Sequence, residues 1–438
     1  MSLYREIGLV GSTLLVMGNI IGIGIFTTSG LIFQQLGPSP WLMGVWILGG
    51  GLAIIGAICY ARLGVLFPRA GGEYAFLRPT YGPAIAFLSG WTSLVIGFTA
   101  PTAASALGLA YYLRVLLPWE LAEDGIGLRI VAVGTLLLVA GLISAGLRAG
   151  TGVHSAVTIL NLVLVLGFAV AVLGKSSAGQ LGEALGGGLL PRDLPSMASA
   201  IVLVMFAYSG WNAAAYIAEE IKSPGRNIPL SLLLGTALVI GLYTLINAAY
   251  LAAAPLEQLG GTIAVAELTA ASVFGPFGRQ LVNLLILVSI LSSLTAMSIA
   301  GPRVYFAMSR DRLFPRWLSA VSPLRKVPAR AIWFQTLIAA GLVLVGDFYQ
   351  ILVYSGFVLI LFATLTVSAL YRVSDARVLP TVFIAVNTVV LGMAVVANPW
   401  ETLAGVGTVL AGIPIYLFFR SRPASVALEA PAEAGRVD

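Results

Sequence analysis

The stretch GNIIGIGIF, from Gly18 to Phe26, places three glycines inside an apolar run that extends from about residue 9 to residue 36. A second stretch, FAYSGWN (Phe206–Asn212), interrupts another apolar run, at about 197–221. Clustered glycines unwind a membrane helix, and lipid cannot satisfy the hydrogen bonds of unwound backbone. Such breaks persist where they are buried in protein or line a wet cavity. A pair of them in corresponding halves of a chain indicates the binding site of a secondary transporter.

The composition indicates a protein that lies almost entirely within a membrane. The chain is 59% hydrophobic and 10% charged, with a mean hydropathy of +0.98, whereas about a quarter of the residues of a soluble domain are charged. Twelve segments come close to the ~20 residues that cross ~30 Å of hydrocarbon. We therefore predict an all-α integral membrane protein that forms one structural unit. The expected spans are 9–36, 41–66, 83–114, 128–147, 153–173, 197–221, 229–253, 279–309, 330–346, 349–371, 378–397 and 401–419.

The distribution of basic residues predicts the orientation of these spans. With a cytoplasmic N-terminus, nineteen of the 24 lysines and arginines fall inside. The five outside are Arg114, Arg129, Lys175, Arg192 and Arg279. This satisfies the positive-inside rule and predicts a multi-pass cell (plasma) membrane protein with both termini in the cytoplasm. The net charge of +6 is then a consequence of topology at the bilayer surface, and no nucleic acid partner is expected.

The order of the segments predicts an internal repeat. The break at Gly22–Gly24 in the first segment recurs near Ser209–Gly210 in the sixth. Five helices per repeat is an odd number, so the two repeats must have opposite orientations in the membrane. The expected parts are a first repeat at 1–173, a second at 174–371, helices eleven and twelve at 372–420, and a cytoplasmic tail at 421–438.

Four motifs in this order resemble the amino acid–polyamine–organocation superfamily. They are GNIIGIGIF, FPRAGGEYAFLRPTYGP from Phe67, FAYSGWNAAAYIAEEIKSPGRNIP from Phe206, and GPRVYFAMSRD from Gly301. The last two look most like the L-type amino acid transporter branch. The resemblance implies a five-plus-five inverted repeat, the LeuT-like fold, with broken helices 1 and 6. It also implies transport of amino acids by alternating access, as a permease or exchanger.

The two breaks suit the two charged groups of an amino acid. Where the first helix resumes, the free N–H groups of Ile23, Gly24 and Ile25 form a helix N-terminus that attracts a carboxylate. Free carbonyls near Ile20 and Ile21 suit an ammonium group. By resemblance, Phe206 would act as an aromatic gate. The alternative role of the glycines is close packing of helices. The expected substrate-binding residues are Ile20, Ile21, Gly22, Ile23, Gly24, Ile25, Phe206, Ala207, Tyr208, Ser209 and Gly210.

The side chains near the breaks predict the class of substrate. Ile23, Phe206, Ala207 and Tyr208 offer no charged partner, so a charged substrate side chain would be poorly compensated. Small neutral or moderately apolar L-amino acids fit best.

Two departures from the family concern the coupling of transport. Asn161 stands where the branch often has a titratable lysine. Ser292 and Ser293, with the carbonyls of Gly18 and Ile21, resemble the sodium site of the wider fold, although such hydroxyls also bond to their own helix. Two alternatives stay open: an exchanger or facilitator driven by substrate gradients, which we favour slightly, and a sodium-coupled symporter. A third departure is Ile23, at a position that is usually Ser or Ala.

The acidic residues all fall at or beyond the expected helix ends. A proton pump that works through a carboxylate within the membrane is therefore disfavoured. Glu219 and Glu220 are expected to pair with arginines as a gate latch. His154 is expected to be a hydrogen-bonded structural residue, and Cys59 a core residue.

The sequence lacks the signatures of other classes of membrane protein. An enzyme would need a cluster of His, Asp, Glu or Cys near one surface, and a channel would need a filter or a repeated pore motif. No cofactor or metal is expected. No disulfide-linked heavy chain is expected either, because the extracellular stretch 114–129 has no cysteine. The expected partners are the amino acid substrate, the lipid bilayer, and Na⁺ or an exchanged amino acid.

Overall fold

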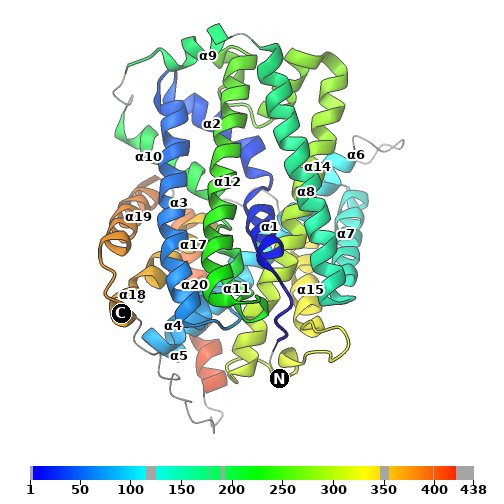
Figure 1. The fold of residues 1–438 in the computed structure, drawn as a ribbon, viewed down its shortest axis with the longest axis vertical. Helices are drawn as coiled ribbons and strands as arrows, with labels where there is room; N and C mark the ends of the chain where they lie inside the picture. Colours follow the sequence, from blue (N-terminus) through cyan, green and yellow to red (C-terminus); the bar gives the residue numbers. More distant parts are fainter. Residues whose placement is uncertain are drawn as a thin grey trace.

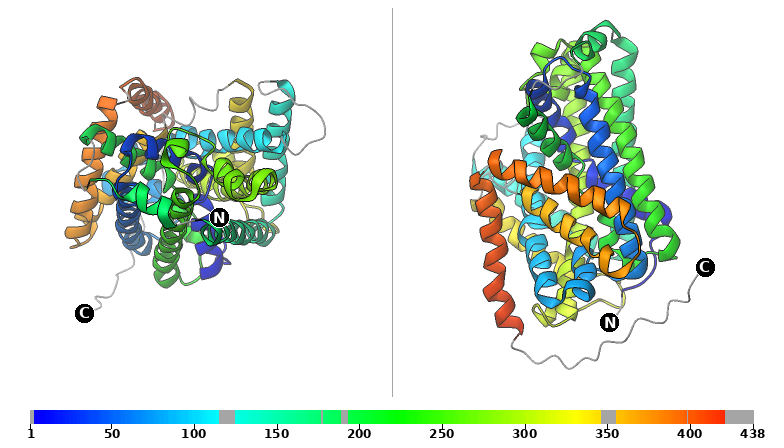
Figure 2. Two further views of the ribbon diagram at one scale, coloured as in Figure 1. Left: turned by 90° about the horizontal axis from the view of Figure 1, so that it is seen from above. Right: turned by 90° about the vertical axis from the view of Figure 1, so that its left-hand side faces the viewer.

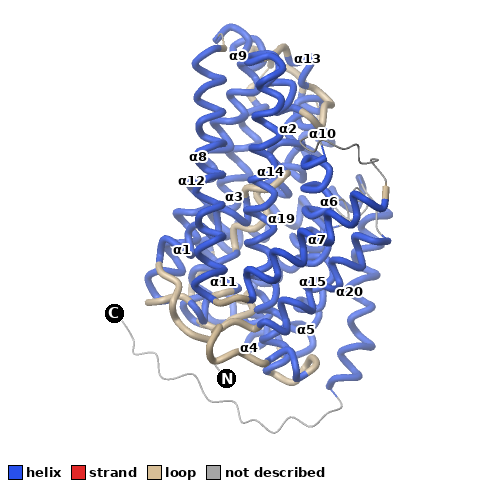
Figure 3. Tube along the Cα trace, turned by 90° about the vertical axis from the view of Figure 1, so that its right-hand side faces the viewer, coloured by secondary structure: helices blue, strands red, loops and turns tan. Residues whose placement is uncertain are grey.

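The computed structural model describes residues 3–114, 125–176, 178–188, 193–345, 355–397 and 399–420. Figure 3 shows helices joined by loops throughout this part of the chain. Within it, the β-pairing is a single isolated bridge between Ile7 and Ile221. The predicted all-α fold is confirmed.

The helices of the first half follow the predicted spans closely. They are α1 (Leu9–Ile20), α2 (Gly24–Leu36), α3 (Trp41–Leu66), α4 (Glu73–Tyr81), α5 (Pro83–Thr92), the π-helical turn η1 (Ser93–Thr99), α6 (Ala100–Arg114), α7 (Ile126–Ser144) and α8 (Leu147–Lys175).

The rest of the described chain continues in the same way. Its elements are α9 (Ala178–Leu185), α10 (Leu194–Ala207), α11 (Ala213–Tyr216), η2 (Ala218–Glu220), α12 (Pro224–Ala253), α13 (Leu256–Leu259), α14 (Val265–Arg310), η3 (Arg316–Ser319), α15 (Ala329–Val345), α17 (Ser355–Ser368), α18 (Leu370–Val373), α19 (Val378–Ala397) and α20 (Pro399–Arg420).

Each of the twelve predicted spans corresponds to one or more described helices, but fewer of these are long and apolar enough to cross a membrane by themselves. Eight described helices are long and apolar enough to cross a membrane, and the bent pair of α1 and α2 makes nine. The sixth segment is divided between α10 and α11, and the ninth and tenth correspond to shorter apolar helices. The start of the tenth predicted span, 349–354, lies outside the described residues. The eighth segment is longer than expected, because α14 continues through a kink at Gly275 (φ 66°).

The two predicted breaks are present. Helices α1 and α2 meet at an angle of 44°. Helix α10 ends at Ala207, and α11 starts only at Ala213. Between them Gly210 has φ +100°, a conformation that residues with a Cβ rarely adopt, so this turn needs glycine.

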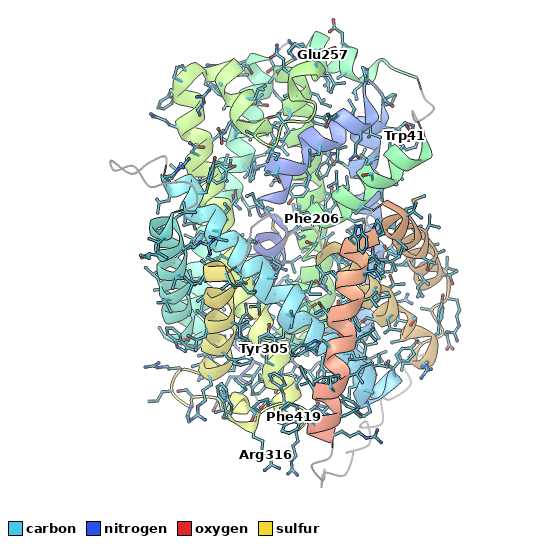
Figure 4. All side chains as sticks on the ribbon, turned by 180° about the vertical axis from the view of Figure 1, so that it is seen from behind. Trp41, Phe206, Glu257, Tyr305, Arg316 and Phe419 are labelled. Atoms are coloured by element: carbon cyan, nitrogen blue, oxygen red, sulfur yellow. The ribbon has the colours of Figure 1, made fainter. Side chains whose placement is uncertain are left out.

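The breaks lie at the centre of the bundle. Helix α1 packs against α12, α8 and α14, and α2 packs against α10. The last helices, coloured orange to red, lie together on one side of the molecule (Figures 1 and 2). We call the end that carries the N-terminus in Figure 1 the lower end, and the end that carries α9 the upper end. In Figure 4, Phe206 lies near mid-height, between Glu257 above and Arg316 below. Both breaks are therefore far from either surface, as a midplane binding site requires.

Candidate functional site

A cavity of about 160 Å³ lies between the two breaks. Eight of the eleven predicted substrate-binding residues line this cavity, and they come from α1, α2, α10 and the connections that follow α1 and α10. The predicted binding residues that line it are Ile20, Gly22, Ile23, Gly24, Phe206, Ala207, Ser209 and Gly210.

Three other predicted residues do not line the cavity. Ile21, Ile25 and Tyr208 are fully buried in the core. The Tyr208 ring packs edge-on against Trp46, with ring centres 5.9 Å apart. These residues hold the breaks in place, and only their backbone groups are candidates for contact with a ligand.

The N-terminus of α2 forms the anion-attracting end of the cavity. Ile23 precedes this helix without a side-chain cap, and no described backbone carbonyl pairs with the amides of Ile23 or Ile25. A Cβ at Gly24 would lie 3.2 Å from the Cα of Ala207. A side chain here would push Ala207 back by a few tenths of an ångström, so glycine lets the first break pack directly on the second.

The acceptors for an ammonium group differ from the expectation. The carbonyl of Ile20 is not free, because it accepts hydrogen bonds from the Gly22 amide (2.9 Å) and from the Tyr243 hydroxyl (2.9 Å). Tyr243 also donates to the carbonyl of Ala207 (3.3 Å), so one side chain joins both breaks.

Asn19 supplies an acceptor that the sequence analysis missed. Its Nδ2 donates to the carbonyl of Gly210 (3.2 Å), whereas its buried Oδ1 has no partner among the described residues. Asn19 lines the cavity. Its position as the polar residue just before the glycine break was the available signal.

The candidate ion site is partly occupied by side chains. The hydroxyl of Ser292 lies 2.8 Å from the Thr158 hydroxyl. A Cβ at Gly18 would lie within 2.6–2.8 Å of atoms of His154, Thr158 and Ser292, so these groups already crowd the first helix. Ser293 lines the cavity beside Gly22. The structure thus places Ser292 beside Gly18 and Ser293 beside Gly22, with Ser292 already hydrogen-bonded.

Asn161 does not reach the first helix. Its Oδ1 accepts a hydrogen bond of 2.5 Å from Ser289 on α14. His154, two turns before on α8, reaches it instead: its Nε2 lies 3.3 Å from the Leu14 carbonyl, and its Nδ1 lies 2.9 Å from the Thr295 hydroxyl on α14. These contacts agree with the predicted structural role of His154.

Glu73 is a correction to the expectation that carboxylates stay away from the site. It begins the connector helix α4, yet it is buried and lines the cavity. Its Oε1 accepts hydrogen bonds from the Tyr60 hydroxyl (2.8 Å) and the Asn212 amide (3.3 Å), and Tyr216 also bonds to the carboxylate. The described ion pairs include none to Glu73. Burial raises the pKa of Glu73 to about 7, although these three hydrogen bonds lower it.

Ion pairs close the lower end of the α10–α11 segment. Glu219 pairs with Arg310 (2.8 Å), and Glu220 pairs with Arg303 (2.7 Å). The amides of Leu3 and Ala70 also donate to Glu219. The predicted pairing of both glutamates with arginines is confirmed.

A polytopic helical bundle with two central helix breaks, a small cavity between them and ion pairs below defines a secondary transporter of the LeuT-like class. The profile of the amino acid permease family matches residues 7–426, and the chain belongs to this family. This membership confirms the resemblance seen in the sequence. It also confirms that the protein is a transporter and not an enzyme.

Curated relatives agree over nearly the whole chain. The Asc-type amino acid transporter 1 of Mus musculus is 27% identical over an alignment that covers 97% of this chain and 83% of the relative. The b(0,+)-type amino acid transporter 1 of Homo sapiens is 27% identical over 95% of this chain and 88% of its own length. The large neutral amino acids transporter small subunit 2 of Homo sapiens is 27% identical over 95% of this chain and 80% of its own length.

Proposed function

We propose that this protein moves small neutral or moderately apolar L-amino acids across the cell membrane by alternating access. The observation that carries the proposal is the meeting of two helix breaks at one cavity. The substrate carboxylate binds the N-terminus of α2. The ammonium group binds the carbonyl of Ile21 and the free Oδ1 of Asn19.

The cavity supports the proposed class of substrate. Its volume of about 160 Å³ is below the roughly 300–1,000 Å³ of typical ligand pockets, which favours small molecules. The described residues that line it include neither lysine nor arginine. Glu73 already accepts three hydrogen bonds from the protein, so a cationic side chain would have to displace them.

We place the lower end of the molecule in the cytoplasm. The ion pairs of Glu219 and Glu220 lie at this end, and the positive-inside rule assigns it to the side with most of the basic residues. Phe206 lines the cavity near mid-height (Figure 4) and is the proposed aromatic gate. The substrate then leaves toward the cytoplasm when α11 and η2 move away from α14.

Substrate gradients are the favoured driving force, through exchange or facilitated movement. The Ser292 hydroxyl is bonded to Thr158, and Gly18 is crowded by His154, which leaves little room for an ion. Sodium symport is the second candidate, because Ser293 lies at the cavity beside Gly22.

Uptake of a labelled amino acid into proteoliposomes separates these alternatives. At fixed pH, stimulation by internal amino acid supports exchange. Concentrative uptake that requires an inward Na⁺ gradient, and that disappears in Ser292→Ala and Ser293→Ala, supports symport. Absence of saturable, stereoselective uptake under every condition would contradict the proposed function. A thermal-shift screen of the twenty amino acids identifies the substrate, because a ligand of the folded state raises its stability.

We also propose that the protein functions without a disulfide-linked heavy chain. The support is the absence of cysteine in the stretch 114–129, of which 115–124 lies outside the described residues. One relative is named a small subunit, so co-purification under non-reducing conditions is the direct test.

A further inference from the structure

Asn387 is an amide side chain that the protein itself leaves unpaired. It lies on α19 and is 1% exposed. Neither its Nδ2 nor its Oδ1 has a hydrogen-bond partner among the described residues. Two other buried amides each keep one bond: Asn247 donates to the Tyr243 carbonyl, and Asn161 accepts from Ser289. Native proteins rarely bury a polar group with no partner, so Asn387 calls for a specific explanation.

Asn387 lines the same cavity as the two helix breaks. Its neighbours in that wall are apolar: Ile360 and Ala363 come from α17, and Phe383 lies one turn before it on α19. The Phe383 ring packs edge-on against Trp211 of the second break, with ring centres 6.2 Å apart. This contact ties α19 to the substrate region. The wall around Asn387 is therefore close to the ligand and offers the amide few protein partners.

The arrangement of the breaks decides which part of a substrate faces this wall. The carboxylate and the ammonium group are assigned to α2 and to the end of α1. The side chain must then extend toward the remaining lining, which comes from α4, η1, α6, α11, α14, α17 and α19. Asn387 is the amide in that lining whose donor and acceptor are both unpaired among the described residues. Asn387 presents both a donor and an acceptor there. A hydroxyl or carboxamide can pair with both, whereas a methyl group can pair with neither.

We propose that Asn387 recognises the side chain of the transported amino acid, and that the preferred substrates are neutral amino acids with a hydroxyl or carboxamide group, such as serine, threonine, asparagine and glutamine. This inference rests on the proposed function, because it needs the carboxylate and ammonium groups at the breaks. A site built to hydrogen-bond a substrate group discriminates strongly against an analogue that lacks it, since its own polar atoms are then left unpaired.

Threonine and valine are the sharpest probes, because they differ by a hydroxyl in place of a methyl group. We expect threonine to bind the full-length protein about tenfold or more tightly than valine, as measured by competition against labelled alanine in proteoliposomes. In Asn387→Leu the preference for threonine over valine should fall to about threefold or less. Thr388→Val is the matched control: this exposed neighbour donates to the Ile384 carbonyl and should leave the preference intact.

Equal affinities for threonine and valine in the unaltered protein would overturn the inference, and so would a preference that persists in Asn387→Leu. Both results leave the proposed function standing as long as alanine is transported. Loss of all amino acid transport in the unaltered protein would instead remove the proposed function, and the inference with it. If Asn387→Leu does not fold, the comparison in the unaltered protein and the smaller variant Asn387→Ala decide the question.

Discussion

Glu220 and Arg303 form a bidentate ion pair that is almost completely buried at the lower end of the molecule. The guanidinium Nε donates to Oε1 (2.7 Å) and Nη2 donates to Oε2 (3.0 Å). The remaining Nη1 donates to the carbonyl of Ile299 (2.7 Å). The pair joins η2, which follows the second break, to α14. In the proposed transport cycle, opening of the cavity toward the cytoplasm separates these two elements, so we expect the pair to hold the lower gate closed.

Replacement of one partner of this ion pair should reduce the stability of the protein far more than replacement of both. Arg303→Met leaves the Glu220 carboxylate buried without its partner, which costs about 3–5 kcal/mol. The double variant Arg303→Met/Glu220→Leu replaces the pair with apolar groups and should recover most of the loss. Thermal unfolding of the detergent-purified proteins measures both effects. Equal unfolding temperatures for the single and double variants would show that the buried charge is not the cause.

Gly24→Leu should abolish uptake without preventing insertion into the membrane. The new side chain would collide with Ala207, whose Cα is 3.2 Å from the position of a Cβ at Gly24, and would enter the cavity. Gly167→Leu on α8 is the control, because a Cβ there meets nothing within 4 Å. Initial rates of uptake, normalised to inserted protein, measure the effect. Near-normal transport by Gly24→Leu would remove the first break from the binding site.

Ile23→Ser should be tolerated and should lower the Kd of the substrate several-fold. The hydroxyl adds a donor beside the carboxylate and widens the cavity. One neutral hydrogen bond contributes about 0.5–1.5 kcal/mol, a factor of roughly 2–12 in affinity. Ligand-induced thermal shifts give the ratio. Complete loss of binding would mean that Ile23 itself shapes the pocket by contact with the substrate.

Glu73 should make the stability of the protein depend on pH. Its pKa of about 7 in the folded protein lies above its ordinary 4.5, so the folded state binds this proton more tightly than the unfolded state. The resulting stabilisation is complete below about pH 4 and is lost as the pH rises to about 7. The unfolding temperature should therefore fall more steeply between pH 5 and 7 in the unaltered protein than in Glu73→Gln.

Tyr60→Phe provides the matched control for Glu73. It removes a donor to the charged carboxylate, so the pKa should rise and the loss of stability should extend to higher pH. Parallel pH profiles for the unaltered protein and Glu73→Gln would show that Glu73 does not titrate in this range.

The local properties of the sequence determined the membrane segments and their breaks. Hydropathy over some twenty residues places a helix in the bilayer whatever lies beside it. The glycines at 22, 24 and 210 interrupt helices because they lack a Cβ. The pairing of Glu219 and Glu220 with arginines was predictable too, since buried charges at helix ends need opposite partners. The boundaries of the inverted repeat stay a prediction.

Only the tertiary structure decided which side chains meet at the cavity. The Tyr243 hydroxyl, 223 positions away in the chain, donates a hydrogen bond to the Ile20 carbonyl. Glu73 lines the cavity although it belongs to a connector that hydropathy places outside the membrane. Asn387 faces the cavity from a helix beyond the predicted repeats, and His154 reaches the first helix where Asn161 does not. The physical reason is that the face a helix turns inward depends on its rotation and tilt against distant neighbours. A nearly all-apolar sequence carries little information about that rotation, because lipid and protein core favour the same residues.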